Sequence, residues 1–309
     1  MNKNSKIYIA GHKGLVGGAI LRLLKKAKYK NLIIADHSDL DLEKEKDVFN
    51  FLKKERPEYV FLCAALVGGI MDNKTRPGDY IYKNLKIETN VIEAARLFGA
   101  KKLLFMGSSC IYPRLAEQPI KEDYFMTGKL EPTNEAYAIA KIAGISMCQS
   151  YRTQYNVDFI SIMPTNIYGP GDNLDPQKSH VIPALFRKFH DAKKNKQKEL
   201  SLWGTGSAKR EFLHCDDLAE ASIFLMQNYS SGEIINVGTG QDVSIKELSE
   251  KIAKIVGFNG LLSWDITKPD GMPRKLLDVS KIHNLGWKHK IDLDKGLKQS
   301  YEWFKKQIK

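Results

Sequence analysis

The residues of this chain best suited to chemistry are Tyr137 and Lys141, four positions apart, and Ser108 upstream of them. On a helix, side chains at i and i+4 share one face, so the Lys141 ammonium would lie near the Tyr137 phenol and lower its pKa from about 10 toward neutrality. Tyr137 could then donate a proton, while Ser108 could hydrogen-bond a carbonyl oxygen. Hydride transfer between a ketone and an alcohol needs this arrangement.

A glycine run near the N-terminus could hold the cofactor that such a transfer requires. Residues 10–17 read Ala-Gly-His-Lys-Gly-Leu-Val-Gly and stand between an expected strand and an expected helix. Glycines there permit a tight turn and a close approach of the backbone to a pyrophosphate, and the helix N-terminus adds partial positive charge. The run predicts dinucleotide binding by Gly11, His12, Lys13, Gly14, Leu15, Val16 and Gly17.

Two signals conflict over the 2′ position of that cofactor. Asp36 closes the expected second strand, nineteen residues after Gly17, where a carboxylate normally binds the ribose hydroxyls and favours NAD. Lys13 and His37 could instead contact a 2′-phosphate. These residues leave both NAD and NADP open.

The elements that must position these groups alternate in the N-terminal half of the chain. Short strands are expected at 6–10, 32–35, 59–62, 102–106 and 159–163, and helices at 15–28, 44–54, 79–98 and 134–155. Strand and helix in alternation predict an α/β fold with a Rossmann-type, doubly wound parallel sheet. The expected domain spans residues 1–167 and also receives the segment 216–240.

After Pro164 this rhythm breaks. Segments rich in Gly, Pro and Asn, at 168–177, 203–207 and 268–274, separate helices expected near 181–194, 216–229, 244–256 and 294–306. We expect residues 168–309 to form a smaller, discontinuous C-terminal α/β substrate-binding lobe over the carboxyl ends of the strands, where ligands bind in such sheets.

Composition excludes several classes of protein. Of the 309 residues 43% are hydrophobic and 27% charged, which is ordinary globular usage, so disorder and fibrous repeats are disfavoured. The strongly apolar runs are far shorter than the roughly 20 residues of a membrane span. The N-terminus leads directly into the first expected strand, leaving no room for a signal peptide. A cytoplasmic protein with no membrane association is therefore expected.

Cysteine spacing and charge indicate no further partner. The four cysteines form no CxxC pair, so they are expected to be reduced, and no metal site is predicted. The net charge of +12 would suit a polyanion, but the lysines lie in distant segments and no nucleic-acid recognition motif accompanies them. We expect no nucleic-acid partner, although a nucleoside diphosphate would benefit from the positive field.

Several segments together resemble bacterial GDP-L-fucose synthases, over about residues 6–306. They are Gly107-Ser-Ser-Cys-Ile-Tyr-Pro113, Glu131-Pro-Thr-Asn-Glu135 with Tyr137-Ala-Ile-Ala-Lys141, Met163-Pro-Thr-Asn166, Ser179-His-Val-Ile-Pro183, Arg210-Glu-Phe-Leu-His214, Lys268-Pro-Asp-Gly271 and Pro273-Arg-Lys-Leu-Leu-Asp278. The resemblance implies 3,5-epimerisation of GDP-4-keto-6-deoxy-D-mannose followed by reduction at C4. It also implies NADPH as the reductant, although the arginine that the family carries near His37 is missing here.

The resemblance assigns further residues. Cys110 and His180 occupy the positions of an acid and base pair that inverts the carbons beside the ketone, and a thiol can act there only as thiolate, so a cationic neighbour such as Lys141 or protonated His180 is expected. Cofactor contacts are implied for Asp36, His37, Lys141, Pro164, Asn166, Ile167 and His180. Contacts to the GDP-sugar are implied for Lys188, where family members often carry arginine, and for Trp203, Arg210 and Asp270; His214 is expected nearby.

Three alternatives stay open. The substrate could be a GDP-4-keto-6-deoxy-heptose that is reduced at C4 with or without epimerisation. The chain could instead be a non-catalytic NAD(P)-binding regulator, although such proteins typically lose the tyrosine or lysine that stand here at 137 and 141. Relatives of this fold pair through two long helices, so we expect a homodimer formed by the helices at 79–98 and 134–155.

Overall fold

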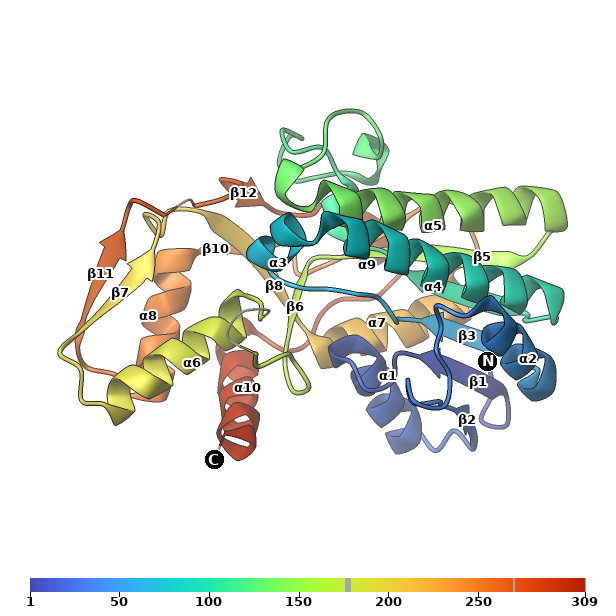
Figure 1. Cartoon of the computed structure of the whole chain (residues 1–309), viewed down its shortest axis with the longest axis horizontal. Helices are drawn as coiled ribbons and strands as arrows, with labels where there is room; N and C mark the ends of the chain where they lie inside the picture. Colours follow the sequence, from blue (N-terminus) through green and yellow to red (C-terminus); the bar gives the residue numbers. More distant parts are fainter. Residues whose placement is uncertain (176–178, 269, 309) are drawn as a thin grey trace.

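A parallel six-stranded sheet forms the centre of the larger lobe, with its strands in the order β2-β1-β3-β4-β5-β9 (Figure 1). The computed structural model describes residues 1–175, 179–268 and 270–308. The strands are β1 Lys6–Ala10, β2 Asn31–Ile33, β3 Tyr59–Leu62, β4 Lys102–Met106, β5 Asp158–Pro164 and β9 Ile235–Val237. The predicted Rossmann-type doubly wound sheet is confirmed.

Helices cover both faces of this sheet. Strand β4 contacts α5 and α7, and all five of its residues are buried. Helices α4 and α5 lie side by side, while α1 packs against α7 (Figure 1). The helices of this lobe are α1 Leu15–Lys26, α2 Glu45–Glu55, α3 Ile70–Thr75, α4 Pro77–Leu97, α5 Glu135–Tyr155, α7 Cys215–Asn228 and α9 Ser280–Asn284, with short 3-10 turns η1 Ser109–Ile111, η2 Glu122–Tyr124 and η3 Pro132–Asn134.

A smaller lobe, at the left of Figure 1, has its own apolar core. Its helices are α6 Val181–Lys194, α8 Ile245–Val256 and α10 Leu293–Gln307. Strands β10, β8 and β12 form one sheet, β6 pairs with β8, and β11 pairs with β7. Their bounds are β6 Asn166–Tyr168, β7 Glu199–Trp203, β8 Lys209–His214, β10 Asp242–Ser244, β11 Leu261–Asp265 and β12 Arg274–Lys275. The sequence analysis missed these strands, because they pair with segments that are distant in the chain.

A buried carboxylate joins strands and turns where the two lobes meet. Glu211 on β8 has no exposed surface. Its Oε1 accepts hydrogen bonds from the backbone N–H groups of Thr239 at 2.6 Å and Gly240 at 2.8 Å, and its Oε2 accepts one from that of Leu277 at 2.9 Å. Three backbone donors satisfy this acid, so it fixes β8 relative to the turn after β9 and the chain after β12.

Two predicted loops extend beyond the described residues. Pro176 and Gln177, in the segment 168–177, and Pro269, in the segment 268–274, lie outside them. Within the described ranges, none of the helices combines the length and the apolar character needed to span a bilayer.

Candidate active site

The glycine run forms a close-packed turn between β1 and α1. A Cβ atom at Gly17 would lie 2.3 Å from the carbonyl oxygen of Gly11, and one at Gly11 would lie 2.8 Å from the backbone of Ala64. Gly11 also has a φ of +86°, in the region that favours glycine. Helix α1 starts without a side-chain cap at Gly14, so its first N–H groups are free to bind a phosphate. This cradle fits a dinucleotide pyrophosphate.

Three side chains were expected near the 2′ position of the cofactor: Asp36, Lys13 and His37. Of these, Asp36 and Lys13 form an ion pair. Asp36 accepts a hydrogen bond from Lys13 Nζ at 2.6 Å, and His12 Nε2 lies 3.1 Å from its other oxygen. The Lys13 hydrogen bond holds the pKa of the Asp36 carboxyl below its usual value. His37 is exposed. The carboxylate that would repel a 2′-phosphate therefore stands beside two groups that can carry a positive charge.

The phenol of Tyr137 and the ammonium of Lys141 project from α5 toward the end of β4. Tyr137 hydrogen-bonds the Ser108 hydroxyl, and Lys141 Nζ lies 5.8 Å from the centre of the Tyr137 ring. Lys141 donates to the Met106 carbonyl at 3.0 Å, and its Nζ lies 3.0 Å from Oε1 of Glu88 on α4. Only 2% of the Lys141 side chain and 1% of the Glu88 side chain are exposed.

This pairing changes the expected acid–base behaviour of Tyr137. The prediction was that Lys141 lowers the pKa of the phenol toward neutrality. Instead, burial raises the pKa of Tyr137 well above its usual value, and the nearby Cys110 and Glu88 raise it further. Burial therefore holds the phenol in its protonated form, and Lys141 is paired with the Glu88 carboxyl, whose own pKa burial raises.

Cys110 lies in the η1 turn directly after Ser108. Its sulfur accepts a hydrogen bond from Asn134 Nδ2 at 3.1 Å, and Lys275 Nζ lies 3.6 Å from it. The expected cationic neighbour of this sulfur is therefore present, but it is Lys275 and not Lys141 or His180, which were named as examples. Lys141 is held by Glu88, and His180 is directed to an aspartate.

That aspartate, Asp172, is buried in the loop before α6. His180 is the N-cap residue of α6, and its Nδ1 lies 3.6 Å from Asp172 Oδ1. About 45% of the His180 side chain is exposed, so the imidazole can reach solvent or a ligand. Asp172 Oδ1 also accepts a hydrogen bond from the backbone N–H of Asn173 at 2.8 Å, which fixes its orientation.

The four residues expected at the GDP end lie around one loop of the small lobe. Lys188 Nζ on α6 stands 5.1 Å from the centre of the Trp203 ring, and burial lowers the pKa of this lysine. Asp270 accepts hydrogen bonds from the backbone N–H and hydroxyl of Thr205, two residues after Trp203, at 2.7 and 2.8 Å. Asp270 also interacts electrostatically with the Arg210 guanidinium on β8. An exposed indole thus stands near two cationic side chains, which suits a base and a pyrophosphate.

The remaining cofactor candidates line the edge between the lobes. Pro164 ends β5, while Asn166 and Ile167 form β6. The Asn166 amide donates to the Glu211 carbonyl at 2.8 Å, so its side chain is engaged in joining β6 to β8.

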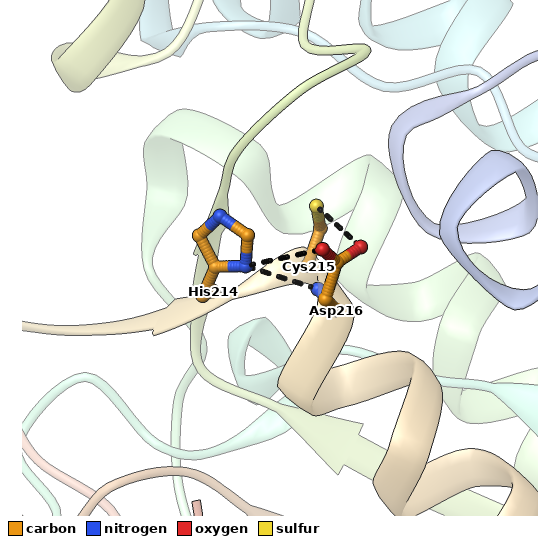
Figure 2. A group of neighbouring side chains, drawn as sticks. All are labelled: His214, Cys215 and Asp216. Carbon is orange, nitrogen blue, oxygen red and sulfur yellow. Dashed lines mark hydrogen bonds and ion pairs between the residues drawn. The ribbon is translucent and has the colours of Figure 1, made fainter. Parts of the chain in front are cut away.

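Among the residues that the structure describes, one group of side chains has the composition of a metal site, namely His214, Cys215 and Asp216 at the start of α7 (Figure 2). His214 Nδ1 accepts from the backbone N–H of Asp216 at 3.2 Å, as a helix cap does. Arg22 lies 2.8 Å from Asp216 Oδ1 and 3.7 Å from the Cys215 sulfur. Burial raises the pKa of the Cys215 thiol to about 12. A neutral thiol and a resident guanidinium disfavour a cation, so we assign no metal here.

Four residues beside these candidates were given no role by the sequence analysis. They are Glu88, Asn134, Asp172 and Lys275. Asn134 and Lys275 lie within motifs that carry the family resemblance, and Glu88 is a charged residue on the buried face of an amphipathic helix. The charged residue on an apolar helix face can be recognised in the sequence, but the sequence does not show which residue it pairs with.

The chain belongs to the NAD dependent epimerase/dehydratase family, whose sequence model matches residues 7–238. Within that family it groups with GDP-L-fucose synthases, as the motifs predicted: it is 56% identical to GDP-L-fucose synthase 1 of Arabidopsis thaliana, over 99% of this chain and 95% of the relative.

Among the solved structures that match the whole fold are two heptose reductases. One is a GDP-6-OMe-4-keto-L-xylo-heptose reductase from C. jejuni, 42% identical, with a TM-score of 0.94 over 100% of this chain and 99% of that one. The other is the GDP-mannoheptose C4 reductase of Campylobacter jejuni with NADP bound, 43% identical, with a TM-score of 0.90 over 99% of each chain.

Proposed function

We propose that this protein epimerises GDP-4-keto-6-deoxy-D-mannose at C3 and C5 and reduces the product at C4 to GDP-L-fucose. One observation carries the proposal: Ser108, Tyr137 and Cys110 lie together at the end of β4, so groups for reduction and for epimerisation surround a single position. The identity to GDP-L-fucose synthases over the whole chain supports the same reaction.

The reductive step uses the buried part of the site. The nicotinamide cofactor supplies the hydride for C4. Tyr137, whose raised pKa keeps it protonated, gives its proton to the C4 oxygen, and Ser108 donates a hydrogen bond to the same oxygen. Lys141 carries its charge next to these groups, fixed by Glu88 and the Met106 carbonyl.

The epimerisation uses Cys110 and His180. The C4 ketone acidifies the protons on C3 and C5, and hydrogen bonds from Ser108 and Tyr137 to its oxygen stabilise the enolate. In the proposed roles Cys110 removes a proton from one face and His180, oriented by Asp172, returns one to the opposite face.

For the cofactor we propose NADPH. The side chains of Lys13 and His12 lie against the Asp36 carboxylate and offset its negative charge. A 2′-phosphate would also attract the exposed Lys13 ammonium. The Campylobacter reductase with NADP bound supports this choice. Oxidation of NADPH and NADH with the keto sugar, followed at 340 nm, tests it: equal kcat/KM for the two would count against a phosphate site.

For the nucleotide end we propose that Trp203 covers the base and that Lys188 and Arg210 bind the pyrophosphate, with Asp270 shaping the loop. In this division, residues 1–167 with 216–240 bind the cofactor and residues 168–309 bind the sugar nucleotide.

A second candidate substrate is a GDP-4-keto-6-deoxy-heptose, which the likeness to two Campylobacter heptose reductases favours. Both keto sugars should be supplied with NADPH in D2O, and the products analysed for deuterium at C3 and C5. The proposal predicts label at both carbons and faster turnover of the hexose. Reduction of the heptose with neither carbon labelled would replace it with the second candidate.

We further propose a cytoplasmic homodimer. All four cysteines are free, which suits a reducing compartment. Tyr82 on α4 and Ile139 and Tyr155 on α5 are large exposed apolar or aromatic side chains on the paired long helices, and a second copy of the chain would cover them. Light scattering should give twice the mass of the chain, and Ile139→Asp should reduce it to that of a monomer.

A further inference from the structure

We infer that Lys275 is a catalytic residue of the epimerisation, whose ammonium holds Cys110 as the thiolate that removes the sugar proton. The inference rests on the proposed function and adds a group to it. It starts from the convergence of two nitrogen donors on one sulfur, Asn134 Nδ2 at 3.1 Å and Lys275 Nζ at 3.6 Å.

The other cations of the site are engaged elsewhere. Lys141 is buried against Glu88, 3.0 Å away, and His180 faces Asp172. Lys275, by contrast, has no carboxylate within ion-pair distance among the described residues, so its charge is not compensated. An unpaired ammonium next to a sulfur favours the anion over the thiol by direct Coulomb attraction.

The backbone around Lys275 is fixed from both sides. The Leu276 N–H donates to Gln118 Oε1 at 2.8 Å, and the Leu277 N–H donates to the buried Glu211 carboxylate at 2.9 Å. The Ile120 N–H donates to the Leu276 carbonyl at 2.7 Å. This segment is therefore joined both to the loop of the large lobe and to β8, so the position of the ammonium is set by the assembled lobes.

The register of β12 adds a second relation. Lys275 is the parallel partner of Arg210 on β8, so both side chains leave the sheet on the same face. Arg210 is the proposed pyrophosphate ligand, and Lys275 lies next to the sulfur that faces the sugar. One sheet face thus presents positive charge both to the pyrophosphate and to the adjoining sugar of the substrate.

The proton transfer balances as follows. The Cys110 thiolate forms an S–H bond while the C–H bond beside the ketone breaks, and the electron pair moves to the C4 oxygen. The enolate then takes a proton from His180 on its other face. The thiol returns its proton to solvent and His180 regains one, so no proton is consumed. Lys275 keeps its own protons and stabilises the thiolate before and after each turn.

The first test uses the full-length protein without substrate. Iodoacetamide alkylation of Cys110 is followed by peptide mass spectrometry from pH 5 to 10; burial raises the pKa of Cys63 and Cys148 to about 12, so both react slowly. Lys275→Met should move the pH of half-maximal rate upward by about one unit or more. Lys275→Arg should keep it near the wild-type value, and Lys209→Met, which removes a charge from the neighbouring strand, should not move it. Lys275→Gln replaces the Met variant if that variant fails to fold.

The second test follows the reaction. In D2O without cofactor, Lys275→Met should lower kcat for exchange at C3 and C5 by tenfold or more. Oxidation of GDP-L-fucose by NADP⁺, which needs no epimerisation, should stay within about threefold of wild type.

An unchanged alkylation profile, or a loss confined to KM, overturns the role of Lys275. If wild type itself fails to reduce the keto sugar while the alkylation profile still shifts, the proposed function fails and the Lys275–Cys110 coupling stands.

Discussion

Two charged clusters surround the same position at the end of β4 and differ in almost every physical respect. Lys141 and Glu88 form a dry ion pair inside the large lobe, between neighbouring helices, with 2% and 1% of their side chains exposed. Cys110 and Lys275 meet between a turn of the large lobe and a strand of the small lobe.

The difference concerns how each cluster is assembled. The first is part of one hydrophobic core, so it forms when that lobe folds, and its charges gain strength from exclusion of water. The second exists only where two lobes meet, since Glu211 on β8 joins the loop after β9 to the chain after β12. We therefore expect changes in the first cluster to alter stability together with reduction, and changes in the second to alter epimerisation alone.

The largest effect is expected at Tyr137, the proposed proton donor beside the buried ion pair. Tyr137→Phe removes the proton for C4 and should lower kcat for reduction at least about 100-fold, with cofactor binding retained. Turnover is measured by NADPH oxidation and binding by cofactor fluorescence. Tyr155→Phe, at the exposed end of the same helix, is the matched control and should leave the rate unchanged. Near-normal reduction by the Tyr137 variant would show that another group donates the proton.

The next effect concerns the ion pair itself. Glu88→Gln leaves the Lys141 ammonium buried without its counter-charge and should lower the free energy of unfolding by about 3–5 kcal/mol. Adding Lys141→Met should restore most of that stability while activity stays lost. Urea denaturation measures both. The control is Glu93→Gln on the same helix, whose pair with Arg96 is partly exposed and should be worth about 1 kcal/mol or less. Equal costs at positions 88 and 93 would contradict the contrast between the two clusters.

The smallest effect is expected at the pair of Asp172 and His180, the proposed proton-donating side of the epimerisation. Asp172→Asn keeps an acceptor for the Asn173 N–H but removes the charge 3.6 Å from His180. Because the His180 side chain is about 45% exposed, solvent screens this pair, and the lost attraction is about 1 kcal/mol. Exchange at C3 and C5 should therefore slow roughly fivefold near neutral pH. Reduction and unfolding free energy should not change. Deuterium exchange is the readout, with Asp191→Asn on α6 as control; an equal loss of reduction would show that the clusters are coupled.

The sequence by itself determined the local elements and the identities of the reacting groups. Strands β1, β3 and β4 fall on the predicted ranges because continuous apolar runs between turn residues specify buried parallel strands. The helix that carries both Tyr137 and Lys141 followed from periodicity and the glycine cradle from its spacing, since these are properties of neighbours along the chain.

Only the tertiary structure decided which charges meet. Glu88 lies 53 residues before Lys141 and Lys275 lies 165 residues after Cys110, so neither pair leaves a local signal. The expected action of Lys141 on Tyr137 was wrong because burial, which only the tertiary structure decides, raises the pKa of the phenol. The strands of the small lobe were not predicted either. Their backbone hydrogen bonds join segments that are distant in the chain and that only the folded structure brings together.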